Sequence, residues 1–123
     1  MESLDKVDLV HIDDNGVFKY VLIKVPHTDD NEEEDILNYK IYLRGYISCD
    51  YHANVVRKFR EEVGNDVPME CIGGGRIEKN NAGKKITVYG YSQEFGQANH
   101  SLSAEMLKKK YPDFHVDFSN DGY

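Results

Sequence analysis

Residues 16–25 read GVFKYVLIKV, and this run decides the class of fold. From position 17 to position 25 nearly every residue is β-branched or aromatic, a composition typical of a strand. Apolar side chains occur at both parities of the run, so we expect a strand that is covered on both faces. Lys19 interrupts one parity, and its ammonium must either reach an edge of the sheet or meet an anion. The run therefore predicts a layered α/β domain of the α+β type, built around this strand.

Further strands are predicted on both sides of this run by alternation and by β-branched or aromatic composition. They cover residues 7–12, 39–47, 68–80, 85–92 and 114–118. Residues 13–16 (DDNG) are a turn signal, and the Asn-Gly pair predicts a tight hairpin between the first two strands. The glycines at 73–75 are expected to break the strand over 68–80, and residues 81–83 (NAG) turn the chain back.

Two helices are predicted from apolar spacing and from capping residues. An apolar face recurs between Val55 and Val63, with Ser48 or Asp50 as the N-cap and Gly64 as the stop. A shorter helix is predicted over 104–110, capped by Ser103 and ending in lysines. Counting about six strands and two helices, we expect one domain over residues 1–123.

Charge and composition exclude several classes of protein. The chain has 123 residues with 15 basic and 22 acidic side chains, a net charge of −7. This balance argues against general nucleic-acid binding, which depends on a basic surface. No apolar run approaches the ~20 residues of a membrane span, and the N-terminus has neither signal-peptide nor transit-peptide features. Two cysteines are too few for a disulfide scaffold, so we expect a cytoplasmic protein. We also expect a monomer that does not bind membranes.

The acidity is concentrated in residues 29–35 (DDNEEED), which hold six acidic side chains and no basic one. Such a run repels itself and favours a solvated surface loop. An interaction tail is the alternative interpretation.

His52 is the most informative candidate for chemistry, because it falls in the first turn of the predicted helix. A helix N-terminus attracts anions and disfavours protonation of a nearby imidazole. A neutral imidazole beside an anion site can act as general base or nucleophile. The alternative is a partly exposed surface histidine. Lys19, Arg44 and Arg76 lie on or beside strands and could contact a phosphoryl group, or could form ordinary salt bridges.

The remaining patterns favour no metal or thiol chemistry. The glycines 73–75 could fold into a backbone nest for an anion or could mark a bulge. They match neither a dinucleotide fingerprint nor a Walker loop. The five histidines are scattered, with no His-x-x-x-His or Cys-x-x-Cys pair, so no metal or other cofactor is expected. No arginine stands six residues after Cys49 or Cys71, which excludes the phosphate loop of thiol phosphatases.

Six segments resemble one family in order and in spacing. They are GVFKYVLI from Gly16, RGY from Arg44, YHAN from Tyr51, GGGRI from Gly73, VYGYS from Val88 and SNDGY from Ser119. Together they look like the small phosphohistidine phosphatases of the Janus family. The resemblance covers nearly the whole chain.

The resemblance implies a metal-independent phosphatase that acts on phosphohistidine-containing proteins, with phospholysine as a further substrate class. It implies a mixed six-stranded sheet with two helices. The catalytic histidine of the family falls on His52. The expected phosphate-binding or substrate-binding residues are Lys19, Arg44, Ala53, Arg76, Ser92, Gln93 and Glu94, with Ala53 and the 92–94 segment acting through backbone amides. Whether His52 acts as nucleophile or as base is left open.

The chain departs from the family pattern at Glu94, where the resemblance places a small residue. A carboxylate that faces the phosphate would weaken the binding of anionic substrates, whereas one that points away would change little. His100 is a further candidate for protonating the leaving group, or else a surface residue of a loop. The rival to an enzyme is a non-catalytic module that binds phosphoproteins through the same anion site.

Overall fold

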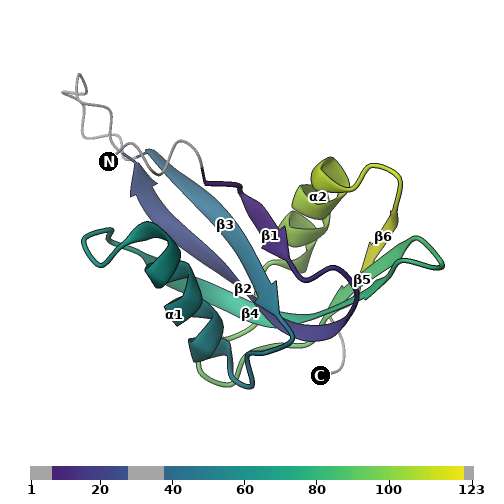
Figure 1. The fold of residues 1–123 in the computed structure, drawn as a ribbon, viewed down its shortest axis with the longest axis horizontal. Coiled ribbons are helices and arrows are strands. Elements are labelled where there is room, and N and C mark those ends of the chain that lie inside the picture. The colour runs from purple at the N-terminus through teal and green to yellow at the C-terminus, as the bar shows by residue number, and fades with distance from the viewer. Residues whose placement is uncertain (1–6, 28–37, 121–123) are drawn as a thin grey trace.

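The computed structural model describes residues 7–27 and 38–120. Within these ranges the chain forms six strands and two helices (Figure 1). In chain order they are β1 (Val10–Ile12), β2 (Gly16–His27), β3 (Asn38–Tyr46), α1 (His52–Val63), β4 (Glu70–Asn80), β5 (Lys85–Tyr89), α2 (His100–Lys110) and β6 (His115–Phe118). The acidic run 29–35 lies outside the described residues, so the loop expected there stays a prediction.

The described strands form one mixed sheet in the order β1-β3-β2-β4-β5-β6. The inner pairs are antiparallel, whereas β1 and β6 at the edges run parallel to their neighbours. The run that opened the sequence analysis is the third strand of this order, between β3 and β4. The predicted α+β class, with about six strands and two helices, is confirmed.

Both faces of β2 are covered, because successive side chains of a strand point to opposite faces of the sheet. Leu22 belongs to the same buried cluster as Leu107 of α2. Its neighbour Val21 belongs to the cluster of Phe59 in α1. The two helices therefore lie on opposite faces, as the double-sided apolar pattern of this strand required.

The sheet curls around α2, while α1 lies against its other face (Figure 1). Helix α2 contacts β1 near one edge of the sheet and both β5 and β6 at the other. Val10 of β1 and Val116 of β6 accordingly share one buried cluster. Helix α1 contacts β2 and β3, and its first turn ends up beside the middle of β4, where the glycines lie.

The turn at residues 13–16 does not make the predicted hairpin. β1 pairs with β3 instead of β2, so that prediction is wrong. The Asp13 carboxylate accepts a hydrogen bond from the Ile47 amide at 2.6 Å, and the Asn15 side chain accepts one from the Asn81 amide at 2.9 Å. Contacts with loops distant in sequence hold this turn, and a local turn signal cannot encode them.

Both helix starts differ from the expected ones. The N-cap of α1 is Tyr51, whose amide donates to the Asn54 side chain at 3.1 Å, so neither Ser48 nor Asp50 caps this helix. Helix α2 begins at His100, four residues before the predicted start, because the Asn99 side chain accepts from the amide of Leu102. The predicted stop of α1 at Gly64 is confirmed.

Arg44 of β3 ties helix α1 and the N-terminal segment to the sheet. Its side chain is fully buried, and Nε and Nη2 donate to the two carboxylate oxygens of Glu62 at 3.0 and 3.1 Å. Nη2 and Nη1 also donate to the carbonyls of Asp8 and Leu9. The guanidinium packs over the Phe59 ring at 4.9 Å. A buried charge with this many partners is a structural group.

We expect Arg44→Met to lower the free energy of unfolding by about 3 kcal/mol, because the Glu62 carboxylate and the carbonyls lose their donors. Denaturant unfolding of the purified variant measures this. Arg57→Met, at an exposed position of α1, is the matched control and should stay within about 0.5 kcal/mol of wild type. Equal stability of the two variants would contradict a structural role for Arg44.

Candidate active site

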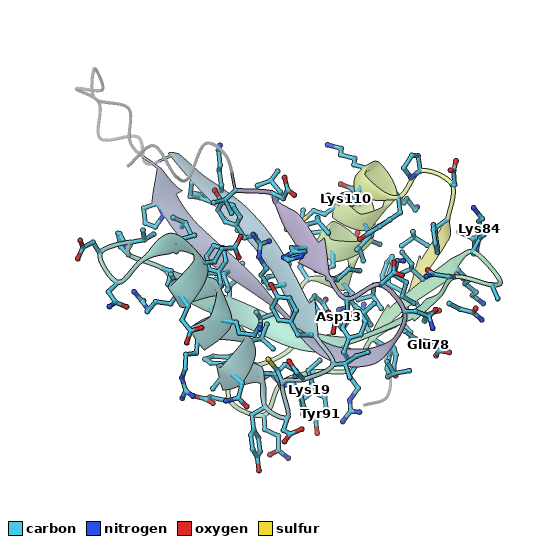
Figure 2. The ribbon with its side chains drawn as sticks, viewed as in Figure 1. Asp13, Lys19, Glu78, Lys84, Tyr91 and Lys110 are labelled. Carbon is cyan, nitrogen blue, oxygen red and sulfur yellow. The ribbon has the colours of Figure 1, made fainter. Side chains whose placement is uncertain are left out.

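A pocket of about 260 Å³ opens at the N-terminal end of α1, a size that suits a small charged group rather than a drug-sized molecule. Figure 2 shows Lys19 and Tyr91 together at the lower end of α1, where the helix begins. The lining residues come from β2, from the start of α1 and from the loop after β5. They are Lys19, Asp50, Tyr51, His52, Tyr91, Ser92, Gln93 and Glu94.

His52 lies at the first position of α1, and its ring is buried against β4. Its Nε2 is 3.0 Å from the carbonyl oxygen of Gly75. A carbonyl can only accept, so Nε2 carries the proton of the neutral ring and Nδ1 carries the lone pair. Within the described part of the chain Nδ1 makes no hydrogen bond. The nitrogen that can take a proton or attack phosphorus is therefore Nδ1.

The surroundings keep His52 neutral. Burial lowers the pKa of His52 below its ordinary value of 6.5, against the opposing effect of the hydrogen bond to Gly75. The positive charges of Lys19 and Arg76 lower this pKa further, and the charge of Glu94 raises it. At neutral pH the ring is thus unprotonated at Nδ1 and available as a base or nucleophile.

The glycines of β4 allow the ring to approach the strand. A Cβ added at Gly74 would lie 2.7 Å from Cδ2 of His52, and one added at Gly75 would lie 2.5 Å from the carbonyl oxygen of Tyr89. The Gly74 amide donates to the carbonyl of Gly96 at 3.0 Å, so it is not part of an anion nest. β4 runs unbroken through these positions, and a register shift lies beside Gly73. The bulge interpretation is the one that the structure bears out.

Two cations lie on neighbouring strands beside this ring. Lys19 of β2 and Arg76 of β4 are directly opposite each other across the strands. The ammonium of Lys19 forms neither a hydrogen bond nor an ion pair with any residue in the ranges 7–27 and 38–120. Arg76 does not line the pocket, but its charge acts on His52. The pair supplies the positive potential that a phosphoryl group needs.

The loop after β5 and the start of α1 contribute backbone donors. The amide of Ser92 already donates to the Gly96 carbonyl at 3.1 Å, so this amide is not available to bind phosphate. Its hydroxyl accepts from the Phe95 amide and keeps its own proton available. The amides of Ala53, Gln93 and Glu94 have no acceptor among the described residues, and so they remain available to bind an anion.

Arg44 does not join this site, contrary to the sequence expectation. Its guanidinium has no exposed surface and is held by Glu62, so it cannot reach a phosphoryl group in the pocket without breaking the contacts that anchor α1. The sequence could not separate it from Lys19 and Arg76, because a basic residue in a strand looks the same whether its partner is a ligand or a carboxylate of a neighbouring helix.

His100 is neither a surface residue nor a proton donor to the pocket. It is buried, its Nε2 donates to the Gly90 carbonyl at 2.8 Å, and its Nδ1 accepts from the Tyr20 hydroxyl at 2.6 Å. It packs against Gly75 on the face of β4 opposite to His52. Both ring nitrogens are thus occupied, and the peptide backbone of β4 separates the two imidazoles.

Three lining residues were not predicted: Asp50, Tyr51 and Tyr91. Tyr51 and Tyr91 belong to the matching motifs and Asp50 directly precedes one, and these positions are the signal that could have indicated them. In the described part of the chain no three His, Cys, Asp or Glu side chains form a group able to hold a metal ion. No helix there has the length and apolarity of a membrane span.

The comparisons with known proteins agree with the family resemblance. A family model described as Janus/Ocnus family matches residues 4–115. The chain is 43% identical over 127 residues to the 14 kDa phosphohistidine phosphatase of Sus scrofa, covering 98% of this chain and 96% of the pig protein. It is 44% identical over 115 residues to the Homo sapiens protein of the same name, covering 93% and 91% of the two chains.

A third relative has another name. The chain is 42% identical over 124 residues to the sex-regulated protein janus-A of Drosophila melanogaster, which covers 99% of this chain and 86% of the fly protein. With the family model spanning most of its length, the chain belongs to the Janus/Ocnus family.

Proposed function

We propose that the chain is a phosphohistidine phosphatase that hydrolyses the N–P bond of phosphohistidine in proteins without a metal ion. The names of the pig and human relatives support the substrate. The observation that carries the chemistry is His52, whose unprotonated Nδ1 is available beside the charges of Lys19 and Arg76. A neutral base and two cations are the parts that phosphoryl transfer requires.

Binding of the phosphoryl group uses cations and amides. Lys19 neutralises the phosphoryl oxygens from the pocket wall, the charge of Arg76 adds to the positive potential beside His52, and the amides of Ala53, Gln93 and Glu94 donate to the oxygens. Phosphoryl transfer passes through a loose transition state, so holding these oxygens in place supplies most of the catalysis.

The reaction can follow either of two routes through Nδ1 of His52. As a nucleophile, Nδ1 forms a new N–P bond while the bond to the substrate imidazole breaks, and water then hydrolyses phospho-His52. This exchange of similar bonds is nearly balanced in free energy. As a base, Nδ1 takes a proton from the water that attacks phosphorus directly. The N–P bond breaks at the same time, the substrate ring with a proton on its other nitrogen leaves as neutral imidazole, and Nδ1 returns its proton to solvent.

The hydrogen bond to Gly75 assists both routes. On the nucleophilic route Nε2 keeps its proton while phosphorus is attached to Nδ1, and the carbonyl of Gly75 stabilises the resulting positive ring. The ring can then leave phosphorus as a neutral imidazole. On the base route the same carbonyl stabilises the imidazolium that forms.

We expect His52→Ala to reduce turnover of a phosphohistidine peptide by at least about 100-fold, because the base or nucleophile is lost. Phosphate release in excess EDTA measures this against wild type. Chelator-resistant turnover that is lost in the variant supports the proposal. Equal rates in both proteins would remove His52 from the chemistry. No turnover in either, with peptide binding retained, would favour a phosphoprotein-binding module.

The pH dependence of kcat/KM should follow the lowered pKa of His52. Activity requires unprotonated Nδ1, so we expect it to rise with pH through a midpoint below 6.5 and then level off. Removal of the Lys19 charge in Lys19→Met should raise this pKa and move the midpoint to higher pH. Ring-proton NMR titration of His52 checks the same shift without turnover.

Lys24→Met, whose ammonium lies over the Tyr39 ring and outside the pocket, is the control and should leave the midpoint unchanged. An unchanged His52 titration in Lys19→Met would show that Lys19 does not act on this ring.

We expect Gly74→Ala to reduce turnover at least about tenfold and to lower stability by about 1–3 kcal/mol, because the new methyl group would displace His52 from β4. Peptide turnover and denaturant unfolding measure the two effects. Gly83→Ala is the matched control, since its Cβ would meet only Asn80 atoms at ordinary contact distances of 3.5 Å or more. A fully active Gly74→Ala would argue against this packing as the support of the ring.

A further inference from the structure

We propose that Glu94, together with Asp50, makes the pocket select phosphohistidines that have lysine or arginine side chains next to them in the substrate. This inference rests on the proposed function and names a narrower class of substrate for the same site. It starts from the one lining position at which the sequence departs from the family pattern.

The side chain of Glu94 is placed to act on whatever enters the pocket. Glu94 lines the pocket from the loop after β5 and is exposed to solvent. Its charge raises the pKa of His52, and it adds to burial, the main cause, in raising the pKa of Cys71 on β4. Asp50, also exposed, lines the pocket from the segment before α1. The two acidic residues thus line the same pocket from different segments of the chain.

The balance of charge decides what these carboxylates favour. Lys19 is the one cation among the described residues that line the pocket, and a phosphoryl group at neutral pH carries about two negative charges. Once the phosphoryl group is bound, its oxygens occupy the ammonium of Lys19. The carboxylates of Glu94 and Asp50 then remain uncompensated beside the peptide that carries the phosphohistidine. A cationic neighbour relieves this repulsion, and an acidic neighbour increases it.

Two exposed rings at the same entrance suit cationic neighbours. Tyr51 is 71% exposed and Tyr91 is 37% exposed, and both line the pocket. Tyrosine rings attract the ammonium of lysine and stack with the guanidinium of arginine. Neither ring is needed to hold the phosphoryl group. They provide apolar surface for the stems of long basic side chains that reach toward Glu94 and Asp50.

The test compares three phosphohistidine peptides of equal length, whose flanking residues are lysine, serine or glutamate. For wild type we expect kcat/KM to be about three- to tenfold higher with lysine than with serine, and lowest with glutamate. Glu94→Gln should reduce the lysine-to-serine ratio, and Glu94→Gln/Asp50→Asn should bring it close to one. The wild-type ratio should also fall as salt is raised.

The control variant is Glu78→Gln, an exposed carboxylate of β4 that does not line this pocket and lies away from Lys19 in Figure 2. It should keep the wild-type ratio. Turnover with equal ratios in wild type and the double variant would overturn the inference and leave the proposed function intact. No turnover of any of the three peptides by wild type would overturn both.

Discussion

The hydrogen bond from His52 Nε2 to the carbonyl of Gly75 is the contact on which the site depends. It orients the ring, sets its tautomer and leaves Nδ1 without a hydrogen bond to any described residue, in a side chain that lines the pocket. It can form only because β4 has no side chain at Gly74, where the ring passes close to the strand. The position of Nδ1 therefore depends on the missing side chain at Gly74 as much as on His52 itself.

The opposite face of the same strand is equally constrained. Gly75 is covered there by the rings of Tyr20 and His100. Tyr20 is fully buried, and its hydroxyl lies 2.6 Å from His100 Nδ1 and 2.8 Å from the Ser103 oxygen. These buried polar groups are all paired, which is the condition under which a polar cluster inside a core rigidifies the structure around it. The carbonyl that holds His52 therefore belongs to a peptide clamped between two layers.

Charge is divided between the core and the pocket. The Arg44 guanidinium donates to Glu62 and to backbone carbonyls, and these bonds hold α1 against the sheet. Lys19 keeps its ammonium at the pocket. Arg44 holds the helix whose N-terminus carries His52, and in the proposed function Lys19 contacts the phosphoryl group. Two cations of similar appearance in the sequence thus differ in their surroundings, because Arg44 is buried and paired with Glu62, whereas Lys19 has no ion-pair partner in the described part of the chain.

Local sequence determined much of this protein. The double-sided apolar pattern of residues 17–25 indicated a central strand with helices on both faces, and the family motifs indicated His52, Lys19 and the 92–94 loop. These features depend on composition and order along the chain. The predicted hairpin at residues 13–16 and the expected sites of Arg44 and His100 failed, because each depends on a partner distant in sequence. The cap of α1 was also predicted wrongly, although its partner Asn54 is local. Only the tertiary structure decided which strands pair, which cation is buried and which ring nitrogen of His52 lacks a hydrogen bond. These features are properties of the folded chain, because they depend on hydrogen-bond partners and on burial.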